Sequence, residues 1–414
     1  MRDTLKHHAL QVCVAVGLAT VPLIATAFMQ NGGGHPARVA VYASVGEELI
    51  TFSADIERAT LTRQSSIMLP GFVQEAWVSP SGPFLYVAWS NGGASYAGSG
   101  VEPVGDKHGI TVFRVDSTGA LHAHGAPAAI RSRPIYITGD RSARHLLVAY
   151  NDPSGISVHA LNADGTVGAE MPQSGSLDVG IYAHNVRVLP SNDAVVLVTR
   201  GNEPTSNTRE DPGALKVFRF DNGKLTNVAS IAPSNGIGFR SRHVDFHPTR
   251  PWAFLTLEAQ NRLEVFGITK GMLTSEPLFN KATLADGTGV KAGQTASTIH
   301  VHPNGQFVYV ANRGGVQGGT NNIAVFRINQ QTGEPSLIQN VDTHGYTPRT
   351  FSVDPGGRML VVGNQTTQSV AGNTVPANLA VFRIRGDGML EFAERYDLAV
   401  GRKPLWWTGL VPLK

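Results

Sequence analysis

Residues 299–313, IHVHPNGQFVYVANR, decide the fold of this chain. They hold a short alternating strand, a Pro-Asn-Gly turn and a strongly apolar strand. The same pattern recurs in five other stretches: AWVSPSGPFLYVAW (76–89), YITGDRSARHLLVAY (136–150), VRVLPSNDAVVLVT (186–199), VDFHPTRPWAFLTLE (244–258) and FSVDPGGRMLVVGNQ (351–365). Neighbouring turns are about 50 to 60 residues apart, so the chain is built from a repeat of that length.

Each copy continues into a third strand and then a weaker fourth one. ALKVFRF (214–220) and NIAVFRI (322–328) are third strands, and KLTNVASI (224–231) is a fourth. Gly, Asn and Asp turns between them indicate an antiparallel meander. Four strands in 50 to 60 residues are typical of one blade of a β-propeller with long loops.

Six copies leave two fragments, one at each end of the repeats. RVAVYAS (38–44) and LITFSAD (49–55) look like second and third strands without a first, and KPLWWTGLVP (403–412) looks like a first strand. Joined, they complete a seventh blade and remove the exposed sheet edges of an open array. The sequence therefore predicts an all-β, seven-bladed propeller of four-stranded antiparallel blades, closed by pairing the N- and C-terminal strands.

Composition agrees with one large β domain over residues 38–414. The 414 residues include 46 Gly and 24 Pro spread along the chain, and only 16% are charged. A net charge of +3 is too small for a nucleic-acid-binding surface, and no nucleic-acid partner is expected. The one cysteine, Cys13, precedes this domain, which therefore contains neither a disulfide nor a thiol nucleophile.

The N-terminus has the pattern of an export signal. Arg2 and Lys6 precede an apolar stretch from about residue 9 to 29, with Ala25-Thr26-Ala27 as a small-x-small cleavage pattern. We expect a signal peptide over residues 1–27, a linker over 28–37 and a periplasmic or extracellular mature protein. The alternative is an uncleaved membrane anchor, since about 20 apolar residues span a bilayer. No other membrane contact is expected.

Polar and ionisable residues recur where the first strand of a blade starts and the second ends. These two positions meet at the same face of a propeller because the two strands run antiparallel. Strand-one starts contribute His184, Arg242, His243, Thr298, His300 and Arg349, and strand-two ends contribute Glu258, Asn312, Arg313, Asn364 and Gln365. If the terminal blade is blade one, the sequence predicts a polar channel mouth formed mainly by blades four to seven.

Two Arg, one carboxylate and a His at that mouth suit an anionic ligand and acid/base chemistry. Arg242 and Arg313 offer planar forks for a carboxylate or phosphate, and Glu258 or His184 can act on water as a base. The alternative is that such residues only hydrogen-bond between blades. That structural role is favoured for Asn312, Asn364 and Gln365, although Asn312 and Gln365 stay candidate ligand contacts with His243, His300 and Arg349. The sequence has no phosphate loop, nucleophile elbow or metal motif, so neither a metal nor a cofactor is expected.

Three segments resemble the seven-bladed propeller lactonases, which include the propeller type of 6-phosphogluconolactonase and the fungal carboxy-cis,cis-muconate cyclase. They are SRHVDFHPTRPWAFLTLE (241–258), STIHVHPNGQFVYVANRGG (297–315) and TPRTFSVDPGGRMLVVGNQ (347–365), and the resemblance covers roughly residues 38 to 410. It implies that a lactone ring is hydrolysed or formed without metal or organic cofactor. The residues it implies for the active site are His184, Arg242, Glu258 and Arg313.

The mechanism that this resemblance suggests is that Arg242 and Arg313 hold the substrate's anionic group and stabilise the oxyanion. Glu258 or His184 would activate water or protonate the leaving alkoxide. The expected ligand is a small lactone or another anionic metabolite, and the expected state is a monomer or weak dimer. Arg200 and an insertion through about Pro212 are expected to reshape the mouth.

Two other functions fit the same fold: a non-catalytic binding or scaffold propeller, and a muconate-type cycloisomerase that forms a lactone. A scaffold needs no acid/base group in the mouth and would show an exposed apolar patch there. A lactonase needs its four residues to converge.

Overall fold

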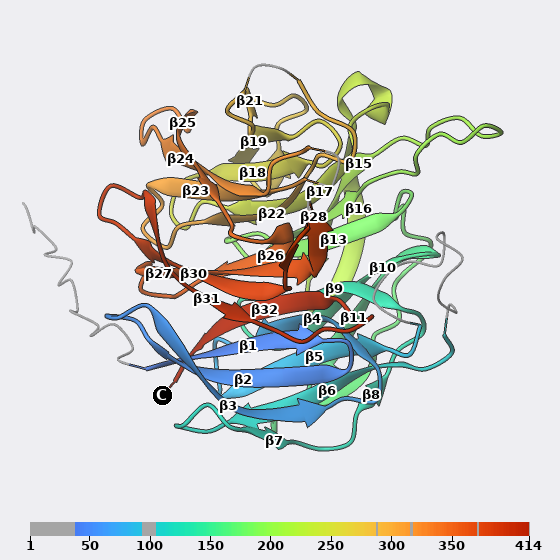
Figure 1. Cartoon of the computed structure of the whole chain (residues 1–414). Helices are drawn as coiled ribbons and strands as arrows, with labels where there is room; N and C mark the ends of the chain where they lie inside the picture. The colour runs from blue at the N-terminus through green and yellow to red at the C-terminus, as the bar shows by residue number, and fades with distance from the viewer. Residues whose placement is uncertain (1–37, 93–104, 287–288, 315–317, 371, 414) are drawn as a thin grey trace, which may run out of the picture. The chain divides into compact units, whose positions relative to one another are not determined.

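The computed structural model describes residues 38–413 except 93–104, 287–288, 315–317 and 371, and strands make up almost all of its regular structure (Figure 1). One short 3-10 helix, η2 (Pro233–Gly236), is the exception in the described ranges. No helix among these residues has the length and apolar character needed to cross a lipid bilayer. The segments assigned above to a signal peptide and a linker lie outside the described residues.

Seven antiparallel sheets form the blades, each with its first strand at one edge. Blade one contains β32 (Leu405–Pro412), β1 (Val39–Val45), β2 (Glu48–Asp55) and β3 (Thr60–Met68). Blade two contains β4 (Phe72–Val78), β5 (Phe84–Ser90), β6 (His108–Val115), β7 (Leu121–Ala123) and β8 (Ala128–Ala129). Blade three contains β9 (Pro134–Gly139), β10 (His145–Asn151), β11 (Ser154–Leu161) and β12 (Val167–Glu170).

The remaining blades follow in sequence order. Blade four contains β13 (Ala183–Val188), β14 (Ala194–Thr199), β15 (Ala214–Asp221) and β16 (Lys224–Ile231). Blade five contains β17 (Ser241–Phe246), β18 (Trp252–Leu257), β19 (Arg262–Thr269), β20 (Met272–Leu273) and β21 (Phe279–Ala282). Blade six contains β22 (Thr295–Val301), β23 (Phe307–Arg313), β24 (Asn322–Ile328) and β25 (Pro335–Asp342). Blade seven contains β26 (Tyr346–Val353), β27 (Met359–Thr366), β30 (Asn378–Ile384) and β31 (Leu390–Asp397).

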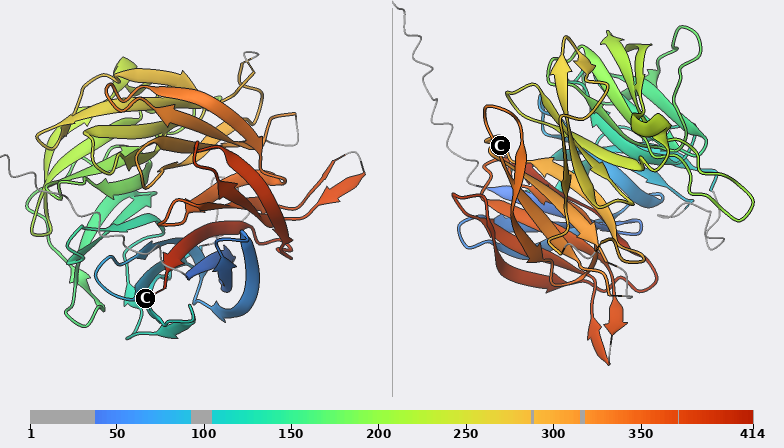
Figure 2. Two further views of the ribbon diagram at one scale, coloured as in Figure 1. Left: turned by 90° about the vertical axis from the view of Figure 1, so that its left-hand side faces the viewer. Right: turned by 90° about the horizontal axis from the view of Figure 1, so that it is seen from above.

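A small hairpin, β28 (Gln368–Val370) and β29 (Asn373–Val375), connects β27 to β30 in blade seven. It pairs only within itself and projects away from the blades (Figure 2).

The first strands of the blades form a closed ring. β4 contacts β9, β9 contacts β13, and the series continues through β17, β22, β26 and β32, which returns to β4. Figure 1 shows these strands toward the centre of the molecule, with the later strands of each blade farther out. The seven-bladed propeller predicted from the repeat is thereby confirmed.

The ring closes through its two ends, as predicted. β32 pairs antiparallel with β1, with Val41 opposite Leu410 and Tyr42 opposite Gly409. The C-terminal strand therefore supplies the innermost position of blade one, and Figure 1 shows it beside β1. The fragments at the ends of the repeats are two parts of one sheet.

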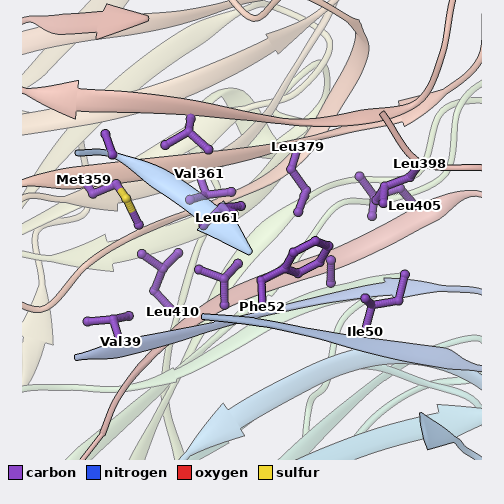
Figure 3. Close-up of a cluster of buried hydrophobic side chains, with 14 of the residues drawn as sticks. Val39, Ile50, Phe52, Leu61, Met359, Val361, Leu379, Leu398, Leu405 and Leu410 are labelled. Atoms are coloured by element: carbon purple, nitrogen blue, oxygen red, sulfur yellow. The ribbon is translucent and has the colours of Figure 1, made fainter. Parts of the chain in front are cut away.

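The core consists of seven apolar layers, one between each pair of neighbouring blades. Figure 3 shows the layer between blades seven and one, where Met359, Val361 and Leu379 pack against Val39, Phe52 and Leu405. Each blade is apolar on both faces because each face is covered by a neighbour. This explains why the second and third strands are continuous apolar runs.

The His-Pro turns connect neighbouring blades at the face opposite the mouth. His247 Nε2 donates a 2.8 Å hydrogen bond to the carbonyl of Gly305, and His302 does the same to Gly357. Both glycines have a positive φ, and a Cβ on Gly305 would lie 2.5 Å from the His247 ring. These histidines therefore belong to the turns and connect neighbouring blades.

Candidate functional site

Bulges in the first strands direct side chains into one mouth of the channel. The pairing register shifts between Ala183 and Asn185 in β13, and between Pro348 and Thr350 in β26, which leaves His184 and Arg349 at the bulges. Similar shifts in β17 and β32 contain Arg242 and Trp406. A β-bulge twists its strand locally and re-aims the extra side chain, so these residues leave the ordinary alternation of the strand.

Glu258 is the centre of the site. Its carboxylate forms an ion pair with Arg242, whose Nε lies 3.3 Å from Oε1, and accepts hydrogen bonds from Arg313 and Arg200. We call these four residues the Glu258 cluster. The backbone N–H of Glu258 donates to Arg240 and its carbonyl accepts from Ala296, both at 2.8 Å. The carboxylate is therefore held between blades four, five and six.

The Glu258 cluster has more positive than negative charge. Burial alone would raise the pKa of Glu258, but Arg313, Arg242 and Arg200 outweigh burial and hold that pKa well below its usual value. The carboxylate is therefore ionised at any physiological pH. Glu203 also pairs with Arg200, so three guanidinium groups face two carboxylates. The remaining excess of positive charge favours an anionic ligand.

His184 lies next to this cluster. Its side chain is buried, with 7% exposed, and its ring centroid is 5.2 Å from that of His243. Burial, reinforced by Arg242 and Arg349, lowers the pKa of His184 well below the ordinary 6.5. The imidazole is therefore neutral at pH 7 and can accept a proton.

Three buried nitrogen atoms at this place have no hydrogen-bond partner among the described residues. They are Nδ1 of His184 and the Nε atoms of Arg242 and Arg313. Buried polar atoms are nearly always hydrogen-bonded, so unpaired ones on residues whose charges act on one another indicate a place completed by a ligand or by water.

Arg349 and Trp406 form another part of the mouth, on blades seven and one. The Arg349 guanidinium lies over the indole ring of Trp406, 3.6 Å from the ring centroid. Trp406 is 8% exposed, and its Nε1 has no partner in the part of the chain that the structure describes.

His300 and His243 face deeper parts of the channel. Both line a cavity of about 150 Å³, together with Glu75, Tyr136 and Arg187. His300 Nδ1 lies 3.7 Å from a carboxylate oxygen of Asp245, and the other oxygen of Asp245 accepts from Arg187 at 2.7 Å. His300 thus has a carboxylate from the neighbouring blade beside it, and its place among the ligand contacts stays a prediction.

The amide residues divide as the structural alternative expects. Asn312 is fully buried, and its Nδ2 donates to the carbonyl of Thr283 and to Asn322 while its Oδ1 accepts from the Thr283 hydroxyl. These bonds leave no group free for a ligand, which speaks against Asn312 as a ligand contact. Asn364 likewise donates to Thr343 and Asn378. Gln365 is half-buried near the end of β27.

Arg200 and Trp406 were not among the candidates predicted from the sequence. Arg200 directly follows β14, as Glu258 follows β18, so the rule for strand-two ends applies to it equally. It starts the loop that was expected to reshape the mouth, and Glu210 of that loop lies 3.1 Å from Arg240. Trp406 occupies the strand-one position of blade one, which only alignment of the C-terminal fragment with the other first strands would reveal.

No three His, Asp, Glu or Cys side chains within the described ranges lie close enough together to hold a metal ion. The ionisable groups of the Glu258 cluster and His184 are guanidinium, carboxylate and imidazole.

Comparison with known proteins identifies the class that this fold and site define. Residues 39–378 match the family described as lactonase, 7-bladed beta-propeller, and the chain belongs to this family. A 6-phosphogluconolactonase of Yersinia pestis is 26% identical over 351 residues, which is 84% of this chain and 90% of that protein. The 6-phosphogluconolactonase of Pectobacterium carotovorum is 26% identical over 356 residues, 85% of this chain and 92% of that protein. The solved structure of a periplasmic gluconolactonase of Pseudomonas aeruginosa, 18% identical, shares the fold with a TM-score of 0.68 over 91% of this chain and 100% of the other.

Proposed function

We propose that this protein hydrolyses the ring ester of a small, anionic sugar-acid lactone at the channel mouth formed by blades four to seven. The observation that carries the proposal is that His184, which is neutral, lies beside the Glu258 cluster with its buried Nδ1 free of any hydrogen bond among the described residues. The names of the curated relatives support lactone hydrolysis as the reaction, and 6-phosphogluconolactone is the first substrate to test.

His184 is the better candidate for the base. Glu258 is ionised, but three arginines stabilise its charge and so make it a weak proton acceptor. In the proposed reaction His184 takes a proton from water as the water oxygen attacks the lactone carbonyl carbon. The ring C–O bond then breaks, and the imidazolium returns the proton to the leaving alkoxide, which yields an open-chain hydroxy acid.

The arginines of the Glu258 cluster suit the developing negative charge. The Nε groups of Arg242 and Arg313 are buried and make no hydrogen bond among the described residues, although Arg242 Nε forms an ion pair with Glu258 at 3.3 Å. A carbonyl oxygen that becomes an oxyanion would accept from them. Burial lowers the pKa of Arg242, as does the neighbouring Arg313, but a guanidinium starts so far above neutrality that it remains charged. Glu258 acts through these arginines as a positioning residue.

An anionic substrate would also strengthen the base. After burial, the charges of Arg242, Arg349 and Arg200 are what lower the pKa of His184. A bound anion offsets these charges, so the pKa of His184 rises toward neutrality when the substrate is in place. Substrate charge and proton transfer are thus coupled at this mouth.

Replacing His184 by Gln is expected to lower kcat for lactone hydrolysis by about 10²- to 10⁴-fold, the usual contribution of a positioned base. The purified domain, residues 28–414, would be assayed against buffer with 6-phosphoglucono-δ-lactone and glucono-δ-lactone. His159→Gln is the matched control because His159 is also buried and has a lowered pKa but contacts Ser157 on a third strand. Equal rates in the wild type and His184→Gln would refute the role of His184, and a wild type no faster than buffer would refute the proposed function.

The pH profile of kcat/KM is expected to stay level through neutral pH and to fall only well below pH 6.5. His184 acts as a base only when neutral, and its pKa lies below 6.5, so activity is lost when pH falls through that lowered pKa. Glucono-δ-lactone is the substrate for this measurement because it has no phosphate that titrates in the same range. An acid limb centred at or above pH 6.5 would contradict the assignment.

We also propose that the protein acts outside the cytoplasm. This rests on the charged, apolar and small-x-small segments of residues 1–27. Cell fractionation of the full chain and sequencing of its mature N-terminus test the proposal. A chain recovered from the cytosol with an intact N-terminus would overturn it.

A further inference from the structure

We infer that Arg349 and Trp406 form a recognition subsite for the anionic group of the substrate, separate from the Glu258 cluster that acts on the lactone ring. The inference rests on the proposed function for the identity of the ligand as a lactone. It assigns the negative charge of that ligand to a place in the mouth that differs from the Arg242 and Arg313 pair.

Arg349 differs from the arginines of the Glu258 cluster and from Arg187 because it has no carboxylate within ion-pair distance among the described residues. Arg200, Arg242 and Arg313 share Glu258, and Arg187 is paired with Asp245. No Asp or Glu among the described residues lies within ion-pair distance of Arg349, whose contact is instead the face of Trp406. A guanidinium stacked on an aromatic ring keeps its edge donors free for a planar anion.

The surroundings of Arg349 also disfavour its charge. Burial, and after it the charge of Arg313, lower the pKa of Arg349 to about 9. Glu75 and Glu258 raise this pKa only in part, and a bound anion would add to their counter-charge. A bound anion would stabilise the arginines of the Glu258 cluster less, since the carboxylate of Glu258 already lies beside them.

Trp406 adds a donor at the same place. Its indole N–H is buried and unpaired within the described residues, although buried tryptophan N–H groups usually find an acceptor. The bulge in β32 positions this ring under the Arg349 guanidinium. One oxygen-rich anion could therefore accept from the guanidinium and from the indole N–H.

The position of this pair also fits a bifunctional substrate. β26 and β32, which carry Arg349 and Trp406, follow blade six around the ring, and blade six supplies Arg313. Arg349 is also among the charges that lower the pKa of His184. A small sugar lactone could thus place its carbonyl at the Glu258 cluster and its charged end at Arg349. The anion would be a phosphate monoester or a carboxylate.

The test compares two pairs of substrates, each pair sharing a lactone ring and differing in charge. They are 6-phosphoglucono-δ-lactone with neutral glucono-δ-lactone, and the carboxylate-bearing glucaro-1,4-lactone with neutral glucono-1,4-lactone. Arg349→Gln is expected to raise KM for the charged lactone that fits by about ten- to a hundredfold, as for loss of charge-assisted hydrogen bonds. KM for the neutral lactone of the same ring should change less than about twofold, because that lactone has no charge for Arg349 to bind. The charged lactone that is affected identifies the anion as phosphate or carboxylate.

Further variants separate charge from packing. Arg349→Lys keeps the charge and should recover part of the affinity, and Trp406→Phe keeps the ring but removes the N–H, with a smaller rise in KM. Arg385→Gln is the control, because Arg385 lies just after β30 of blade seven and pairs with Asp387. Equal loss on charged and neutral lactones, or no change on any, would overturn the subsite.

The affinity of the protein for the hydrolysis products tests the subsite independently of catalysis. Calorimetric titration with 6-phosphogluconate and with gluconate should show that the wild type prefers the phosphorylated acid and that Arg349→Gln loses this preference. If the wild type hydrolyses no lactone but shows this preference, the proposed function fails and the anion subsite stands. Hydrolysis without any preference for charged ligands would leave the proposed function and remove the subsite.

Discussion

A chain that ends at Pro404, and so lacks β32, is expected to show no cooperative melting transition. β32 is the innermost strand of blade one, and its buried apolar side chains are Leu405, Trp406, Trp407, Leu410 and Val411. Burial of a large apolar side chain contributes about 1.5–3 kcal/mol, so these five contribute roughly 8–15 kcal/mol. That is comparable to the whole stability of a domain, about 5–15 kcal/mol. Loss of the strand also exposes the edge of β1 to other chains.

The matched control removes a segment of similar length from blade seven. Residues 368–375, the β28–β29 hairpin, pair only with each other, so their replacement by a short Gly turn should leave melting almost unchanged. Calorimetry and the soluble yield of both variants make the comparison. A truncated chain that melts like the wild type would show that the ring does not depend on its closure.

The fold could be predicted from the sequence because the repeat is local and periodic. The strand after Pro303 is FVYVANR, which is buried on both faces and so appears as a continuous apolar run in each copy. Even the shared blade was predictable, since the fragment at 403–412 has the pattern of a first strand and the fragment at 38–55 lacks one. In a ring of similar units, a missing piece at one end must be supplied by the other.

The site could be predicted only in part, because bulges and partner choice are not periodic. His184, Arg242, Glu258 and Arg313 were found by their place at strand ends, and the structure brings the last three into contact. Their roles were less predictable. Simple alternation does not show that the bulge in β26 frees Arg349, or that Arg242 and Arg313 are already engaged by Glu258. The partner of His300 was no more predictable, since Asp245 belongs to the neighbouring blade.

Glu258→Gln is expected to lower kcat by about 10²- to 10³-fold, the range for loss of one preorganised oxyanion donor. The amide keeps the size of Glu258 but removes the charge that holds three guanidinium groups together, so Arg242 and Arg313 lose the orientation that the oxyanion needs. Breaking a buried ion pair also costs about 3–5 kcal/mol of stability, so melting is recorded alongside activity. Saturating 6-phosphoglucono-δ-lactone separates kcat from binding.

The pH dependence of kcat/KM is the sharper measurement of the role of Glu258. If Glu258 only supported the structure, its replacement would not change the pKa of His184. Removing one negative charge among four arginines lowers the pKa of His184 further, so the acid limb of kcat/KM should move to lower pH in Glu258→Gln. Glu258→Asp keeps the charge, so its kcat/KM should fall at the same acidic pH as in the wild type, and part of kcat should be restored. The control is Glu264→Gln: Glu264 is a buried carboxylate of the same blade that accepts from Asn280, and burial raises its pKa to about 7. Suppose that a folded Glu258→Gln variant has the kcat of the wild type and loses kcat/KM at the same acidic pH. The arginines would then need no carboxylate to act.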